Sequence, residues 1–256
     1  SNIHEAVALW LTNETEAVAT YGEMSQWDVS QVTDMSRLFS TELFMKLPDY
    51  DAEIPGIADF NEDLSGWDVG NVTNFYRMFF GASSFNQDLS QWNVSSATSL
   101  HMMFDSATDF NQSIGNWDVS NVTDMHRTFR LSGYNQDLSA WQTGQVRDMF
   151  GMFYNASFNQ PIGNWDVSSA TNMTFMFREA AFNQPLGDWD VSSVNRMTGM
   201  FQSSAFNQPI GNWEVSNVTI MEHMFQSSAF NQPIGTWDVS NVTRFKKMFY
   251  GCDAFD

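Results

Sequence analysis

FNQPIGNWEVSNVTIMEHMFQSSA, residues 206–229, is one copy of a unit that recurs through most of the chain. Its tryptophan returns after 24 or 25 residues seven times in succession. A fixed period of this size predicts a solenoid, in which each unit stacks on the next. The recurring residues are Trp67, Trp92, Trp117, Trp141, Trp165, Trp189, Trp213 and Trp237, and Trp27 precedes them by 40 residues.

The apolar positions change their period inside each unit. Residues 210–218 follow the pattern I-x-x-W-x-V-x-x-V, which matches the leucine-rich repeat's L-x-x-L-x-L. Trp-x-Val then predicts a short strand with both side chains inward, and the indole N–H bonded inside the core. The M-x-x-M-F run at 221–225 predicts a short helix, for which the preceding threonine is a suitable N-cap. We therefore predict an α/β repeat fold, with short parallel strands on one side and short helices on the other.

The domain organisation follows from where the repeat begins. Residues 1–23 depart from it and show helical spacing, which predicts an N-terminal helical cap over the open end of the array. Residues 24–256 then form nine repeats of 24–25 residues, with an insertion at about 40–59. The chain shows no signal peptide and stops inside a repeat, so we expect it to be a piece of a longer protein.

The charge and composition exclude several classes of partner. The net charge is −19, so nucleic acid and anionic membrane surfaces are unfavourable and cationic partners are favoured. No stretch is apolar enough to span a membrane, and the single Cys252 rules out an internal disulfide. The 23 Phe, 16 Met and 10 Trp predict a core built from large flat side chains.

The run FNQDLSxWDVSxVTxMxxMF, which stands at Phe60–Phe79 and Phe85–Phe104 with small variations, resembles the BspA-like leucine-rich repeats of bacterial, mycoplasmal and protist surface proteins. The resemblance covers roughly residues 24–256. It implies a right-handed solenoid on a secreted or cell-surface protein, with a role in adhesion or host interaction. Gln142-Thr143-Gly144 departs from the family's Asp-Val-Ser, so that repeat is expected to be locally distorted.

An acidic column is the main candidate for a binding site. The residue after Trp is acidic in seven of nine repeats, and carboxylates on strands ~4.8 Å apart repel by roughly 0.9 kcal/mol per pair in water. Either a local hydrogen bond to a nearby Ser or Thr, or a bound cation or cationic partner, must offset this. The column consists of Asp28, Asp68, Asp118, Asp166, Asp190, Glu214 and Asp238, and Asn93 and Gln142 interrupt it.

Basic residues lie elsewhere in the repeat. Apart from Lys46, every Lys and Arg follows a tryptophan by six to thirteen residues, on the part of the repeat predicted to be helical. The predicted strand face therefore carries only negative charge, whereas ordinary surfaces mix both signs.

The sequence holds no motif for catalysis. It shows no Ser-His-Asp order, P-loop, EF-hand or glycine-rich nucleotide fingerprint, so we predict no enzyme activity and no cofactor beyond weak Ca²⁺ binding. His101 and His126 fall at the same position of adjacent repeats, but the sequence shows no carboxylate or Cys motif beside them that would favour a metal site.

These observations predict a non-catalytic binding or adhesion module, extracellular or on the cell surface, that acts through the acidic strand face. Its expected partner is a protein or glycan on another cell or surface, and we expect a monomer. One alternative is a structural spacer that displays other domains. Others are a Ca²⁺-dependent or carbohydrate-binding module and, because of the regular threonine column, an ice-binding protein.

Overall fold

Two helices open the chain in the computed structural model, which describes residues 2–41 and 56–255. Helix α1 spans Ile3–Thr12, α2 spans Glu14–Tyr21, and a short 3₁₀ helix, η1, spans Met24–Gln26. The side chains of Asn2 and Asn13 cap the two α-helices by accepting backbone N–H groups. The helical character expected for this region is present, while its status as a separate domain stays a prediction. Most of the predicted insertion at 40–59 lies outside the described residues.

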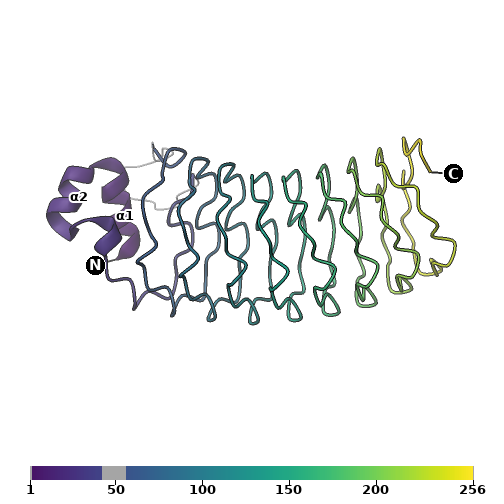
Figure 1. Ribbon diagram of the computed structural model, residues 1–256, viewed down its shortest axis with the longest axis horizontal. Coiled ribbons are helices and arrows are strands. Elements are labelled where there is room, and N and C mark those ends of the chain that lie inside the picture. The colour runs from purple at the N-terminus through teal and green to yellow at the C-terminus, as the bar shows by residue number, and fades with distance from the viewer. Residues whose placement is uncertain (1, 42–55, 256) are drawn as a thin grey trace.

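The rest of the described chain winds into coils that stack along one axis, with the helices at one end and the C-terminus at the other (Figure 1). Each repeat forms one coil. Eight isolated parallel bridges join equivalent residues of successive coils in the described part of the chain. The bridged residues are Asp34, Asn74, Ser99, Asp124, Asp148, Asn172, Arg196, Ile220 and Arg244.

After each bridge the backbone forms a series of tight turns, here called the turn ribbon. Every second residue from Leu100 to Ser106 donates its backbone N–H to a carbonyl oxygen of the next coil, at 2.8–3.0 Å. Two of these residues, Met102 and Ser106, are left-handed, with φ of 56° and 64°. A left-handed residue turns its N–H group along the stack, so the hydrogen bonds between coils replace those of a helix.

The predicted α/β fold is wrong, and so is the leucine-rich-repeat architecture expected from it. Within residues 2–41 and 56–255 there is no strand, and both α-helices lie before the repeats. Stacked tryptophans of neighbouring coils are 6.3–6.5 Å apart, whereas paired strands lie ~4.8 Å apart, so Trp-x-Val is too widely spaced for a ladder. The threonine caps no helix. Its N–H donates to the preceding coil instead, as Thr98 does to Thr73.

Flat aromatic side chains fill the interior. Residues Trp67 to Trp237 of the tryptophan column are only 3–8 % exposed. Each indole N–H donates to a backbone carbonyl of an earlier coil, as Trp92 does to Leu64 at 2.9 Å. The predictions that the tryptophans are core residues and that their N–H groups are bonded inside are confirmed. Two further columns of stacked aromatic rings, here called ladders, pack beside the tryptophans. The first contains Phe104 and the second contains Phe110, and the centroids of these two rings are 4.0 Å apart.

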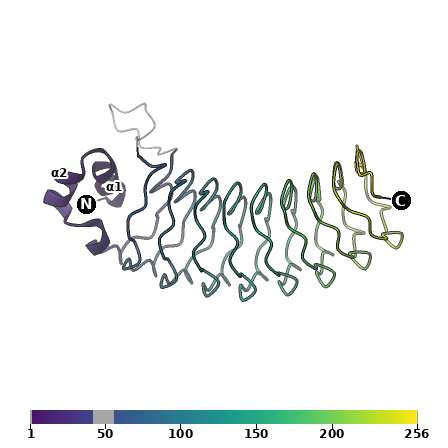
Figure 2. The same ribbon diagram turned by 45° about the horizontal axis from the view of Figure 1, so that its top comes forward.

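The spacing between equivalent rings changes across the interior, and this curves the stack. Rings that come from the turn ribbon, such as Phe104 and Phe129, are 5.5–5.8 Å apart from coil to coil. The second ladder, which includes Phe158 and Phe182, has spacings of 5.9–6.3 Å, and the stacked tryptophans have 6.3–6.5 Å. The stack bends into an arc (Figure 2). The smaller spacing puts the turn ribbon on the concave side and the tryptophan column toward the convex side.

Replacing Tyr134 with phenylalanine is expected to stabilise the protein by about 1 kcal/mol. Tyr134 is fully buried in the second ladder. Its hydroxyl lies near the backbone of Ile114 but forms no hydrogen bond of normal geometry among the described residues. Denaturant unfolding measures the change. Phe110→Tyr is the matched control, since it places a second hydroxyl in the neighbouring coil of the same ladder and should destabilise. A loss of stability in Tyr134→Phe would show that the hydroxyl is satisfied.

Candidate functional site

The acidic column is exposed and held by local hydrogen bonds. All seven predicted residues, from Asp28 to Asp238, have exposed side chains. In each, one carboxylate oxygen accepts the backbone N–H of the residue two places on, at 3.0–3.1 Å. Ser120 and Ser168 also donate their hydroxyls, at 2.6 Å, to Asp118 and Asp166. The local hydrogen bond that the sequence offered as one explanation of the column is therefore present throughout.

These hydrogen bonds also keep the carboxylates charged. Hydrogen bonds from the side chain and then the backbone of the following serine lower the pKa of Asp118, Asp166 and Asp190. Within the described part of the chain, the second oxygen of each of these carboxylates has no hydrogen-bond partner. These three carboxylates are thus fixed, ionised groups, each with one oxygen available, on the convex side of the stack.

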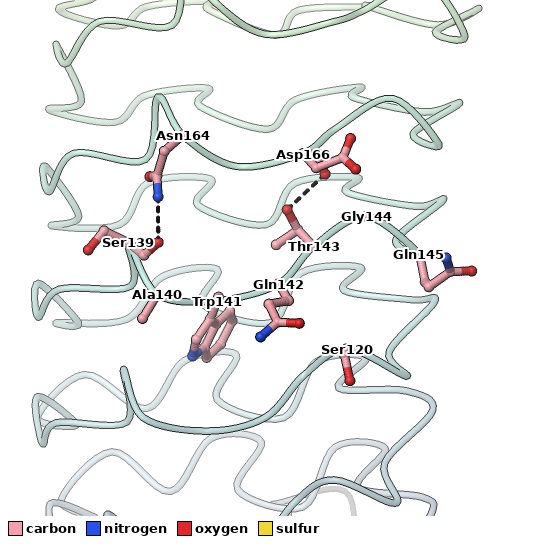
Figure 3. A pocket seen from close by; sticks show the side chains of 10 residues that line it. All are labelled: Ser120, Ser139, Ala140, Trp141, Gln142, Thr143, Gly144, Gln145, Asn164 and Asp166. Atoms are coloured by element: carbon pink, nitrogen blue, oxygen red, sulfur yellow. Dashed lines mark hydrogen bonds between the residues drawn. The ribbon is translucent and has the colours of Figure 1, made fainter.

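A shallow hollow of about 600 Å³ lies where Gln142 interrupts the column (Figure 3). Thr143 is turned inward there, and its hydroxyl donates to the backbone oxygen of Asp166 at 2.8 Å. A side chain at position 144 would clash with the Asp166 carboxylate, so the glycine there leaves space for that carboxylate. The Gln-Thr-Gly departure thus produces a dent beside Asp166, and the coil keeps its Trp141 indole hydrogen bond to Ile114.

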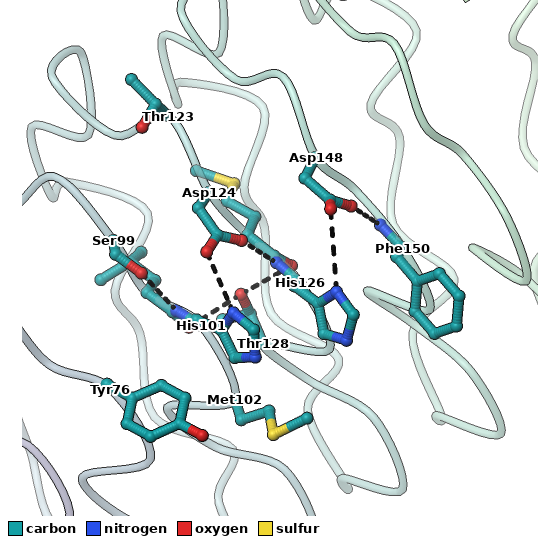
Figure 4. Close-up of polar contacts among 12 residues, drawn as sticks. Tyr76, Ser99, His101, Met102, Thr123, Asp124, His126, Thr128, Asp148 and Phe150 are labelled. Carbon is teal, nitrogen blue, oxygen red and sulfur yellow. Dashed lines mark hydrogen bonds and ion pairs between the residues drawn. The ribbon is translucent and has the colours of Figure 1, made fainter. Parts of the chain in front are cut away.

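A second group of polar side chains lies on the turn ribbons. The sequence predicted that His101 and His126 could approach each other, but it did not predict the aspartates beside them. His101 Nδ1 lies 3.0 Å from Asp124 Oδ2, and His126 Nδ1 lies 3.8 Å from Asp148 Oδ2. The two imidazole rings stack with centroids 4.4 Å apart, and their Nε2 atoms point away from the carboxylates (Figure 4). The repeat period is the sequence feature that could have revealed these pairs, because it places each aspartate one coil after its histidine.

Both aspartates of these pairs are also tied to the backbone. Asp124 accepts the N–H of His126 at 2.9 Å, and Asp148 accepts that of Phe150 at 2.8 Å. Burial raises the pKa of each carboxyl, but the interaction with the histidine and then the hydrogen bond from the backbone outweigh it, and the net pKa is lowered. The aspartates are thus ionised acceptors that orient the imidazole rings.

The described residues contain no group of three or more His, Cys, Asp or Glu side chains that could hold a metal ion. None of their helices is both long and apolar enough to cross a membrane.

Comparison with known proteins gives a family for the repeats. A family model described as "Mycoplasma protein of unknown function, DUF285" matches residues 11–133, 50–162, 130–205 and 181–256, in overlapping segments. The matches span nearly the whole chain, from within α1 to its last residue. The comparisons with curated proteins and with solved structures gave no match.

Proposed function

We propose that this chain, which belongs to the Mycoplasma protein family of unknown function DUF285, is a non-catalytic binding or adhesion module. We place it outside the cell or on its surface, as the resemblance to surface-protein repeats implies. The acidic column is its proposed binding surface, and the partner is a protein with a basic segment. The observation that carries the proposal is the repetition of an exposed, ionised and locally fixed carboxylate on successive coils.

Fixed carboxylates favour binding for two physical reasons. A carboxylate held by its own backbone loses little side-chain entropy when a partner arrives, because it is already ordered. A row of like charges also attracts a basic segment from a distance, which raises the association rate more than the final affinity. The net charge of −19 adds to this attraction.

The double variant Asp166→Asn with Asp190→Asn is expected to bind a lysine-rich peptide several-fold more slowly at low salt, and the difference should fade at high salt. Stability should change by less than about 0.5 kcal/mol, because asparagine can accept the same local hydrogen bond. Surface plasmon resonance at two salt concentrations gives the association rates, and denaturant unfolding gives the stability.

Asp63→Asn with Asp88→Asn is the matched control. These aspartates make the same bond, to Ser65 and Ser90, but lie four residues before the tryptophan, outside the column. An equal slowing in both double variants would show that only net charge matters. If the parent chain shows no affinity for basic peptides, the alternative of a structural spacer is favoured.

A further inference from the structure

Three arginines occupy one left-handed position of the turn ribbon within four consecutive coils. Arg37, Arg77 and Arg127 have φ of 58°, 56° and 53°, and Met102 holds this position in the coil between the last two. We call the three the arginine column. Their guanidinium groups lie 5.0–5.2 Å from the centroids of aromatic rings, with Arg37 and Arg77 over Tyr76, Arg77 over Phe80, and Arg127 over Phe150.

The arginine column lies where the coils are closest together. On the same ribbons, the rings of His101 and His126 are 4.4 Å apart, and those of His126 and Phe150 are 4.5 Å apart. These spacings are much shorter than the 6.3–6.5 Å between stacked tryptophans, so this surface is the concave one. Curved repeat arrays use their extended concave surfaces for binding.

Arg127 carries a charge that its surroundings do not neutralise. Among the described residues it forms no ion pair, and its buried Nε atom has no hydrogen-bond partner. Burial, and then repulsion from Arg130, lowers the pKa of Arg127. A Cβ atom at Gly151 would lie 3.3 Å from Cγ of Arg127, so the absence of a side chain there lets the arginine lie across the next coil.

We propose that the turn-ribbon surface around Arg127 binds a short acidic segment of a partner protein, with a carboxylate of that segment contacting Arg127. A guanidinium that stacks on a ring keeps the N–H donors at its edge, and two of these match the two oxygens of a carboxylate. An added carboxylate would therefore pair with Arg127 without displacing it from Phe150.

The size of the positive region selects a short occupant. The whole chain has a net charge of −19, which repels long polyanions such as nucleic acids. Asp124 and Asp148, beside the two histidines, limit the positive region on one side, and Asp105, paired with Arg130, limits it on another. A short acidic segment therefore suits this region better than a long polyanion. This surface is separate from the convex acidic column and takes the opposite charge.

The test uses a fluorescent octapeptide of alternating Asp and Ser, with an Asn-Ser peptide as the neutral control, and fluorescence anisotropy as the measurement. Arg127→Met should weaken binding of the acidic peptide by about tenfold or more. Methionine already occupies this position at Met102, so packing should be kept. Arg127→Lys retains the charge without the planar donors, so it should lose about threefold to tenfold and serves as the second variant.

Arg196→Met is the matched control, since Arg196 is exposed on a bridge position three coils further along and its loss changes the net charge equally. It should weaken binding less than about twofold. The proposal is overturned if the parent does not prefer the acidic peptide, if Arg127→Met and Arg196→Met lose equally, or if an acidic oligosaccharide binds more tightly than the peptide. None of these results bears on the acidic column, which is tested with basic peptides.

Discussion

Trp189→Ala is expected to lower the free energy of unfolding by about 3–5 kcal/mol, the range for large aromatic truncations in a core. The indole is 3 % exposed and stacks on Trp213 with centroids 6.5 Å apart. Its N–H donates to the carbonyl of Ile162 at 3.0 Å. That carbonyl also accepts the N–H of Trp165, so the loss arises mainly from the cavity and less from an unpaired acceptor.

Denaturant unfolding followed by circular dichroism measures this loss. Trp27→Ala is the control, because Trp27 is only partly buried at the start of the array and should lose less than half as much. In a stack where each coil contacts only its neighbours, a central cavity also weakens the coupling between the two halves. The transition of Trp189→Ala should therefore broaden. A loss below about 1 kcal/mol would contradict the core role of the tryptophan column.

The long-range order of this fold could be predicted from the sequence. The 24- or 25-residue period of the tryptophans predicts that coil stacks on coil, and the inward position of Trp92 and Val94 follows from their spacing. Both residues are buried, and Trp92 donates its N–H to the earlier coil as expected. Such features depend on the repeat alone, because every coil must bury the same side chains against its neighbours.

The local backbone could not be predicted in the same way. Non-glycine residues with positive φ are uncommon, and nothing in the identity of Arg127 or Leu131 indicates φ of 53° and 55°. The conformation is stabilised from outside the segment, because these two residues donate their N–H groups to Phe150 and Tyr154 of the next coil. The helical spacing of the buried methionines says nothing about these hydrogen bonds between coils. The predicted helices were wrong because these bonds replace the hydrogen bonds within a helix.

The candidate sites show the same division. The sequence located the acidic column, from Asp28 to Asp238, and the local serine hydrogen bond was one of its two explanations. It did not reveal that His101 meets Asp124, because that contact requires a side chain to cross to the next coil. The arginines were noted as lying apart from the acidic face, but only the graded ring spacing shows that their side of the stack is concave.

Arg130→Met is expected to destabilise the protein by about 3–5 kcal/mol at neutral pH, because it leaves a buried carboxylate without its counter-ion. Asp105 is 0 % exposed, and Arg130 Nη1 donates to both of its oxygens, at 3.0 and 3.2 Å. The hydroxyl of Ser106 supplies the other hydrogen bond, at 2.9 Å. After the substitution only this neutral donor remains.

The loss should depend on pH in a defined direction. Burial raises the pKa of Asp105 above its ordinary value even though Arg130 opposes this, so removing Arg130 must raise the pKa further. The pKa of Asp105 is thus higher in the folded protein than in the unfolded chain. At pH values between the two, the folded protein binds more protons, so its stability falls as pH rises. Arg130→Met should therefore lie closest to the parent near pH 4 and lose stability steadily toward pH 7.

Asp105→Gln combined with Arg130→Gln separates the missing partner from lost packing. Gln202 and Gln226 occupy the equivalent positions of two later neighbouring coils, so a pair of glutamines already fits this place in the stack. Replacing both partners of a buried ion pair by neutral groups is often nearly neutral, so the double variant should lie within about 1 kcal/mol of the parent. Thermal unfolding from pH 4 to 7 measures all three proteins. A single-variant loss that does not change with pH, or a double variant as unstable as Arg130→Met, would show that Arg130 acts through its packing on Tyr154 rather than through Asp105.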